Sequence, residues 1–363
     1  MFYHWLYPLR EYFFGFNVFK YITFRAAGSA VTAFILSIMM GKFVIQLLKK
    51  FNIGESVRKD KYCATLYEHH KEKEGTPTMG GVLILLVVLI AVLLWANLSN
   101  KYIWIVLFAT LWLGAVGFID DYIKLTQKNS RGLTATVKLT GQLILGIVVG
   151  FIIYYDPYLG DQLNIPFFKN FVVHLGFIYI FFSALVIIGT SNAVNLTDGL
   201  DGLAIGCVLI VAITYSGMSY LTGHFKFSQY LQMNYIPGVG ELTIFCTAVF
   251  GAGLGFLWYN CHPADVFMGD TGALALGGAI GTVAILIKKE LLLILVGGIF
   301  VAEAMSVIIQ VVSFKFRKKR VFLMAPLHHH FQLKGWAEAK IIFRFLIVAI
   351  ILALLSLSTL KLR

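Results

Sequence analysis

Apolar runs separated by short polar segments recur along the whole chain. Each run is close to the roughly 20 residues that a helix needs to cross a bilayer. Runs of this length with few charges indicate membrane-spanning helices, because a helix satisfies its own backbone hydrogen bonds. We expect about ten spans, near 22–48, 79–98, 102–119, 133–154, 173–190, 201–221, 241–258, 272–287, 291–312 and 341–360.

This pattern predicts an all-α polytopic membrane protein with one domain over residues 1–363, since the chain has no fixed-period repeat and no low-complexity linker. Residues 22–363 would form the ten-helix core. Residues 1–21 are aromatic-rich and lack the apolar core and cleavage site of a signal peptide, so we expect an interfacial segment that stays on the protein.

Composition excludes a water-soluble fold, because 59% of the residues are hydrophobic, 13% are charged and the mean hydropathy is +0.81. The net charge of +12 does not indicate nucleic-acid binding, since the basic residues fall in loops between apolar runs. These residues are better explained by contact with a lipid bilayer. The four cysteines show neither a close pair nor the spacing of a metal site.

Basic residues are distributed unevenly between the two sets of loops. The loops after odd-numbered spans contain 17 Lys and Arg, whereas the opposite loops contain 5. The positive-inside rule places the first set in the cytoplasm and both termini in the periplasm. Polar clusters also gather in the predicted cytoplasmic loops, which indicates one active site on the cytoplasmic face.

Two adjacent carboxylates, Asp120 and Asp121, close the third predicted span. Their mutual repulsion favours a nearby cation, and carboxylate oxygens suit a divalent metal. Asp270 opens a later helix, where its charge also suits the helix N-terminus. The alternative for the pair is a solvated helix end beside Lys124.

The loop after the fifth span is dense in amides, carboxylates and glycines, which exceeds what a helix cap requires. Asn195, Asp198 and Asp201 are spaced by three, so a helical turn would bring them onto one side. Gly199 permits close approach of backbone to a ligand.

Further candidates are phosphate and nucleobase contacts. Lys73 and Thr78 lie beside Pro77 at the entry to the second span, and Lys138 is a charge inside the fourth. Phe267 offers an aromatic face to a nucleobase. A lysine at a membrane boundary is also explained by contact with lipid headgroups.

Three consecutive histidines, His328, His329 and His330, occupy the last predicted cytoplasmic loop. Three consecutive side chains do not all face one metal on a helix, so phosphate and substrate contacts are favoured over a zinc site.

Residues 75–81, 118–121, 192–202, 267–270 and 325–330 together resemble the motifs of the phospho-N-acetylmuramoyl-pentapeptide transferases. That family belongs to the polyprenyl-phosphate N-acetylhexosamine-1-phosphate transferases, and the histidine motif points to the muramoyl branch. Gln332 and Ala337 depart from the family pattern, where glutamate and proline are expected.

The resemblance implies an enzyme, usually dimeric, of the bacterial inner membrane. It transfers phospho-N-acetylmuramoyl-pentapeptide from its UDP conjugate to undecaprenyl phosphate, giving lipid I and UMP, and needs Mg²⁺. The implied catalytic residues are Asp120, Asp121, Asp270 and His328, with the three aspartates also as metal ligands. The implied substrate contacts are Lys73, Thr78, Lys124, Lys138, Asn195, Asp198, Gly199, Leu200, Asp201, Asn260, Phe267, His329 and His330.

Other functions remain open at this stage. A sister enzyme would transfer N-acetylglucosamine 1-phosphate, and an ion-coupled transporter would also carry acids near a membrane. Transport sites lie near the bilayer midplane, however, whereas these acids lie at span ends. Direct attack by the acceptor and a covalent aspartyl intermediate on Asp120 are equally compatible with the sequence.

Overall fold

The computed structural model describes residues 1–50, 75–126, 132–168 and 172–361. Within these ranges the protein is almost entirely helical, which confirms the predicted all-α polytopic class. One helix matches each predicted span: α2 (Ile22–Lys50), α4 (Gly81–Trp95), α5 (Lys101–Thr126), α6 (Ala135–Tyr154), α7 (Ile178–Thr197), α8 (Leu203–Gly223), α10 (Leu242–Asn260), α11 (Gly269–Leu286), α13 (Gly298–Arg317) and α15 (Glu338–Ser358). Nine of the described helices are long and apolar enough to cross a membrane, and α4 is a shorter apolar helix.

Short elements connect these helices. Residues 1–21 form α1 (Phe2–Trp5) and the 3₁₀ turns η1 (Tyr7–Glu11) and η2 (Phe14–Lys20), while α9 (Phe225–Leu231), η5 (Val239–Glu241), α12 (Leu293–Val296), α14 (Leu327–Leu333) and η6 (Thr359–Lys361) follow later. Strands β1 (Gln162–Asn164) and β2 (Val172–His174) form an antiparallel hairpin with Leu163 opposite Val173.

The hairpin corrects the fifth predicted span, which was expected to begin at residue 173. Gly176 has a positive φ of 55°, and its N–H donates to Asp161 Oδ2 at 2.9 Å. A left-handed residue ends the extended segment, so α7 begins only at Ile178. The sequence pattern predicted a helix from residue 173 because hydropathy alone does not distinguish a short apolar strand from the start of a helix.

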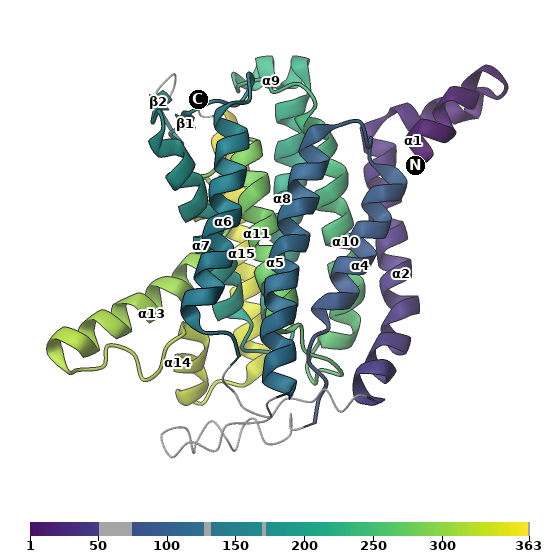
Figure 1. Ribbon diagram of the computed structural model, residues 1–363. Coiled ribbons are helices and arrows are strands. Elements are labelled where there is room, and N and C mark those ends of the chain that lie inside the picture. The colour runs from purple at the N-terminus through teal and green to yellow at the C-terminus, as the bar shows by residue number, and fades with distance from the viewer. Residues whose placement is uncertain (51–74, 127–131, 169–171, 362–363) are drawn as a thin grey trace.

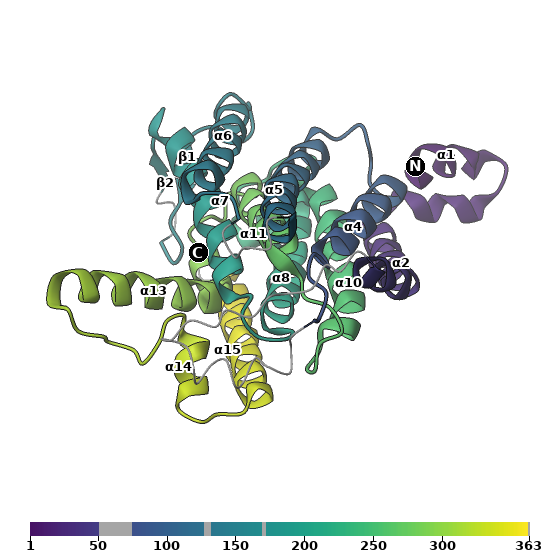
Figure 2. The same ribbon diagram turned by 60° about the horizontal axis from the view of Figure 1, so that its bottom comes forward.

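Helix α11 lies in the middle of the bundle (Figure 2), and its residues from Thr271 to Leu286 are all buried. Glycines let its neighbours approach closely. A Cβ on Gly117 of α5 would lie 2.3 Å from the carbonyl oxygen of Asp270, and one on Gly81 would lie 2.2 Å from the nitrogen of Gly272. The start of α11 is therefore fixed by direct backbone contact with α4 and α5.

Helix α13 differs from the single span predicted at 291–312. The chain breaks at Gly297, between α12 and α13, and α13 then leaves the bundle at a steep angle (Figures 1 and 2). Its buried residues, Ile299, Phe300, Glu303 and Ser306, all lie in its first half. The length and hydropathy of a segment predict that it forms an apolar helix, but they do not predict the angle that this helix makes with the bundle.

Both chain ends lie at one end of the bundle (Figure 1). The N-terminal ammonium of Met1 donates to the carbonyl of Leu93 at 2.6 Å, and Lys361 Nζ donates to the carbonyl of Tyr230 in α9 at 3.3 Å. The C-terminal ends of α2 and α5, together with α14, lie at the other end. The assignment of the first end to the periplasm remains a prediction.

Candidate active site

Three carboxylates meet where α5 passes the start of α11. Asp120, Asp121 and Asp270 each offer an oxygen, and these oxygens lie within 4.8 Å of one another. Asp120 and Asp121 are buried, and Asp270 is partly buried. The sequence produces this approach because Gly117, one turn before Asp120, has no side chain to hold α11 away.

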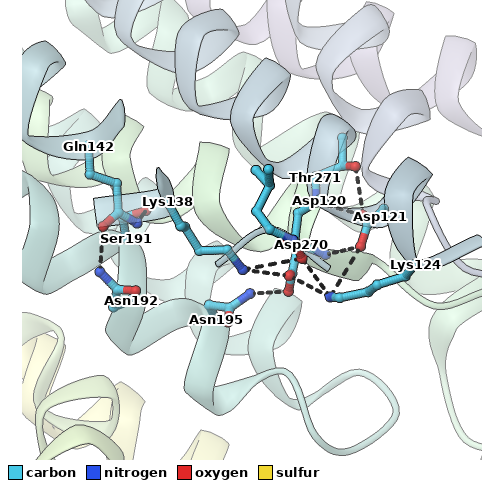
Figure 3. Close-up of polar contacts among 11 residues, drawn as sticks. Asp120, Asp121, Lys124, Lys138, Gln142, Ser191, Asn192, Asn195, Asp270 and Thr271 are labelled. Carbon is cyan, nitrogen blue, oxygen red and sulfur yellow. Dashed lines mark hydrogen bonds and ion pairs between the residues drawn. The ribbon is translucent and has the colours of Figure 1, made fainter. Parts of the chain in front are cut away.

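Two lysines neutralise most of this charge (Figure 3). Lys124 Nζ lies 2.6 Å from Asp120 Oδ2 and 2.7 Å from Asp270 Oδ2. Lys138 Nζ, from α6, lies 2.8 Å from Asp270 Oδ2 and 3.2 Å from Asp120 Oδ2. Lys124 follows Asp120 by four residues, so both lie on the same face of α5. Three carboxylates and two ammonium groups leave the cluster with one net negative charge.

Asp121 caps α11 from a neighbouring helix. Its carboxylate accepts hydrogen bonds from the Thr271 N–H at 2.9 Å, the Thr271 hydroxyl at 2.7 Å and the Asp270 N–H at 3.3 Å. A carboxylate is favourable at a helix N-terminus, where N–H groups lack partners. A Cβ on Gly269 would lie 2.8 Å from Asp121 Oδ2 and 3.0 Å from Thr78 Oγ1, so Thr78 also faces this corner.

The cluster is completed by α7 and by the segment before α6. Asn195 Nδ2 donates to Asp270 Oδ1 at 2.5 Å, and the Leu133 N–H donates to Asp120 Oδ1 at 2.7 Å. Behind Lys138, Gln142 bonds to Ser191 and Asn192 (Figure 3). These contacts fix α6 against α7 beside the carboxylates.

The helical turn that would bring Asn195, Asp198 and Asp201 onto one side does not extend past Thr197. Helix α7 ends at Thr197, so the two aspartates lie in the following turn. Asn195 points to Asp270, whereas Asp201 accepts from the Ala264 N–H at 3.3 Å. The helical spacing of three does not apply once the helix has ended.

A second polar group lies around Asp201. His262 Nδ1 is 2.9 Å from Asp201 Oδ2 and 3.5 Å from Glu338 Oε2. Asn260 ties the same loops together, because its Oδ1 accepts from the Gly202 N–H at 3.0 Å and its Nδ2 donates to the Val266 carbonyl at 2.8 Å. Asn260 is buried, and both of these hydrogen bonds join it to backbone groups of the protein.

Main-chain hydrogen bonds close the site between two distant segments. The Phe267 N–H donates to the Pro77 carbonyl, the Gly80 N–H to the Phe267 carbonyl and the Gly81 N–H to the Met268 carbonyl, each at 2.8 Å. Phe267 keeps part of its surface exposed, whereas Met268 is buried. The join fixes the entry to α4 beside the start of α11.

The histidine motif is anchored by an acid that the sequence analysis did not identify. Glu303 of α13 accepts from the N–H groups of Leu327 at 2.7 Å and His328 at 3.2 Å, and its Oε2 lies 3.2 Å from His328 Nδ1. Both side chains are 0% exposed. A Cβ on Gly199 would lie 2.3 Å from His328 Nε2, so only glycine fits there.

The other two histidines have different partners. His329 Nδ1 lies 2.7 Å from Gln332 Oε1, and Gln332 Nε2 donates to Glu338 Oε1 at 3.1 Å. The amide at position 332 therefore bridges a histidine and a carboxylate. His330 Nδ1 accepts from the Leu323 N–H at 3.1 Å. Burial, with Lys334 nearby, lowers the pKa of His330, which favours the neutral form that this acceptor role requires.

The structure brings together a connected core from the predicted residues: Asp120, Asp121, Lys124, Lys138, Asn195 and Asp270. Leu200 is buried in the hydrophobic core, which leaves its backbone for any contact with a ligand. Lys73 lies outside the described residues. Glu303, Gln142 and Glu338 were missed, although an acid and an amide within apolar runs are signals of functional polar groups.

The carboxylate cluster fits a divalent cation. Asp120, Asp121 and Asp270 supply three oxygen ligands, the donor type that hard cations prefer. The group formed by Asp201, His262 and Glu338 also has ligand atoms within 4.8 Å of one another. The first group is better suited to a phosphate-bound metal, because Lys124 and Lys138 lie beside it.

Comparison with known proteins agrees with this arrangement. Residues 103–288 match the model of glycosyl transferase family 4, and residues 73–85 match the phospho-N-acetylmuramoyl-pentapeptide-transferase signature 1. Proteins named phospho-N-acetylmuramoyl-pentapeptide-transferase are 53% identical in Desulforapulum autotrophicum, 52% in Syntrophus aciditrophicus and 54% in Pelobacter propionicus, over 100% of this chain and of each relative. With its apolar helices, this identifies a multi-pass protein of the bacterial inner membrane. The chain belongs to the phospho-N-acetylmuramoyl-pentapeptide-transferase family.

Proposed function

We propose that this protein transfers phospho-N-acetylmuramoyl-pentapeptide from its UDP conjugate to undecaprenyl phosphate, giving lipid I and UMP in peptidoglycan synthesis. One observation carries the proposal. Helices α5, α6, α7 and α11 bring Asp120, Lys124, Lys138, Asn195 and Asp270 into a single network at one end of the bundle. Such a mixture of carboxylates and ammonium groups suits a reaction between two phosphate anions.

The reaction requires the acceptor phosphate to attack the sugar-linked phosphorus of the donor. A new phosphorus–oxygen bond forms, the bond from that phosphorus to the oxygen of UMP breaks, and UMP leaves with the electron pair. Lys124 and Lys138 are positioned to stabilise charge on the phosphates, since each ammonium group also contacts Asp270. We assign Asp120 to preparing the acceptor oxygen and Asp121 to fixing the start of α11.

We further propose Mg²⁺ as the cation, with Asp270, Asp120 and Asp121 as the residues that would hold it. Bound Mg²⁺ supplies charge neutralisation on the donor pyrophosphate. The remaining proposed contacts surround the nucleotide and sugar: Lys73, Thr78, Asp198, Gly199, Leu200, Asp201, Asn260, Phe267, His328, His329 and His330. We also propose a homodimer, which light scattering of the purified protein would test.

The test is release of UMP from UDP-N-acetylmuramoyl-pentapeptide in detergent with undecaprenyl phosphate and Mg²⁺. Asp120→Asn and Asp270→Asn preserve side-chain shape and remove charge, so we expect losses of at least about 100-fold. Asp161→Asn is the matched control, because Asp161 precedes β1 at the other end of the bundle and should leave turnover unchanged.

The alternatives give different outcomes in the same assay. Turnover with UDP-N-acetylglucosamine alone would assign the chain to the sister transferases. Absence of UMP release with both donors, from a preparation that unfolds cooperatively, would contradict the transferase proposal. A radiolabelled phospho-sugar retained on the protein after denaturation would favour the covalent aspartyl route over direct attack.

Removal of the metal should separate activity from folding. A chelator is expected to abolish UMP release and leave the unfolding temperature within about 2 °C, since Lys124 and Lys138 already compensate the carboxylates. A large fall in the unfolding temperature would instead indicate a structural metal.

A further inference from the structure

The chain folds back on itself after α13 and forms an open pocket with that helix. Gln310 holds the returning segment, because its Oε1 accepts from the N–H groups of Val321 and Phe322 at 3.0 Å and its Nε2 donates to the Phe322 carbonyl at 3.1 Å. The volume of this open pocket is about 560 Å³, within the usual range of small-ligand sites.

The lining of this pocket is divided between apolar and cationic side chains. Val311, Phe314 and Leu323 form apolar wall, and Lys315, Lys318 and Arg320 contribute basic groups. A ligand that matches both must combine an anion with hydrocarbon.

Among the described residues, no acid forms an ion pair with the cations of the pocket. Five of the six residues from 315 to 320 are Lys or Arg, and no Asp or Glu follows until Glu338. Over the stretches of chain that the structure describes, no carboxylate lies within 4.0 Å of Lys315, Lys318 or Arg320. Within the described part of the chain, their charge is left to favour an anionic ligand.

The surroundings of the pocket are those of a bilayer surface. Helix α13 leaves the bundle (Figure 2), and its outward side chains include Val311 at 59% exposure and Phe316 at 78%. Apolar side chains on a projecting helix suit lipid chains, and a basic cluster at its end suits headgroups.

We propose that this pocket binds an anionic phospholipid of the membrane. Lys315, Lys318 and Arg320 hold the headgroup phosphate, and Val311 and Phe314 contact the upper acyl chain. The pocket is distinct from the carboxylate cluster, since none of its residues contacts Asp120, Asp121 or Asp270. Binding of the lipid does not depend on the proposed transferase reaction.

A bound lipid would also order the segment that leads into the histidine motif. Leu323 lines the pocket, and its N–H donates to His330 Nδ1 at 3.1 Å. We therefore expect slower amide hydrogen exchange over residues 321–333 when phosphatidylglycerol is added.

Native mass spectrometry of the full chain in detergent tests the proposal with phosphatidylglycerol and phosphatidylcholine of identical acyl chains. The wild type should retain phosphatidylglycerol preferentially. Lys315→Gln/Lys318→Gln/Arg320→Gln should weaken its binding at least tenfold. The matched control, Lys42→Gln/Lys49→Gln/Lys50→Gln, removes three cations from α2 and should bind like the wild type.

A further variant separates folding from binding. Lys315→Arg/Lys318→Arg/Arg320→Lys keeps all three charges and should retain the lipid. Equal losses in the pocket variant and the α2 control would overturn the proposal, as would unchanged binding in a pocket variant that remains folded. Loss of polyprenyl-phosphate binding with phosphatidylglycerol retained would also overturn it, because the pocket would then serve the acceptor.

Discussion

Lys138 compensates the charge of two carboxylates from different helices, and removing that charge should separate metal binding from turnover. In Lys138→Met the cluster becomes more negative, so we expect Mg²⁺ to activate the enzyme at concentrations about tenfold lower. Maximal turnover should fall by at least about tenfold, because a cation that stabilises phosphate charge is lost.

The measurement is the rate of UMP release as a function of Mg²⁺ concentration. Lys138→Arg is the control, since it retains the charge and should keep the wild-type Mg²⁺ requirement. An unchanged Mg²⁺ curve in Lys138→Met would show that the metal does not share the carboxylates that Lys138 contacts.

Glu303 positions the histidine motif. Its replacement should therefore reduce activity even though Glu303 itself does not contact the substrate. Glu303→Gln retains the shape but loses the negative charge beside His328 Nδ1 and one of the two acceptors for backbone N–H groups. Hydrogen bonds to charged groups are worth about 1.5–3 kcal/mol, which predicts a loss of roughly 10- to 100-fold in kcat/KM.

A purely structural role predicts a different result for this variant. If Glu303 acts through His328, the pH profile of kcat should change in Glu303→Gln. An unchanged pH profile with a lower unfolding temperature would assign Glu303 to folding alone.

The residue types of the site could be predicted from the sequence, but their pairings could not. Adjacent carboxylates, an intramembrane lysine and a polar loop identified Asp120, Lys138 and Asn195 as candidates. Which of them meet depends on how four helices pack, and that information is absent from local spacing. Glu303 was missed because a single acid in a long apolar run has little weight when runs are judged by mean hydropathy.

At the scale of elements, the contact between α5 and α11 depends on glycine. In Gly117→Ala the new Cβ would lie 2.3 Å from the Asp270 carbonyl oxygen, which forces the helices apart. We expect a loss of about 1–3 kcal/mol in the free energy of unfolding and a larger loss of activity, since Asp120 and Asp270 would separate.

Thermal unfolding in detergent measures the first effect and UMP release the second. Gly189→Ala in α7 is the control, because a Cβ there meets nothing within 4 Å. It should be neutral or stabilise α7 by up to about 1 kcal/mol. Equal unfolding temperatures for both variants would contradict close packing of α5 on α11.

The apolar runs of the sequence predicted the existence of each spanning helix. They did not predict three other features of the fold. The hairpin before α7 depends on the left-handed Gly176 and on the hydrogen bond that its N–H donates to the Asp161 carboxylate. The direction of α13 depends on the break at Gly297. The end of α7 at Thr197 leaves Asp198 and Asp201 in the following turn, where Asp201 accepts from the Ala264 N–H.

At the scale of the whole molecule, a buried ion pair fastens the end of the bundle opposite the site. Arg25 of α2 makes two hydrogen bonds to Glu241, at 2.6 and 2.7 Å, and Glu241 also accepts from the Asn97 N–H at 3.0 Å. Arg25→Met leaves a buried carboxylate without its charge partner, so we expect a loss of about 3–5 kcal/mol in stability.

The double variant Arg25→Met/Glu241→Leu should be more stable than Arg25→Met, because it leaves no isolated charge. Unfolding temperatures of the two singles and the double provide the comparison. UMP release at low temperature should remain near wild type in each, since the pair lies at the end of the bundle away from the carboxylates. A double variant less stable than Arg25→Met would contradict this account.

The join between residues 77–81 and 267–268 is made by amides and carbonyls of the main chain. Such bonds involve no side-chain atoms, so substitutions other than at Gly80 and Gly81, where a Cβ would meet neighbouring backbone, do not require compensating substitutions in the other segment. Methods that infer contacts from correlated substitutions among relatives would therefore receive little signal from the two segments that close the site. In an alignment of this family, we therefore expect weak correlation between substitutions at residues 77–81 and at residues 267–268, although the two segments are in direct contact.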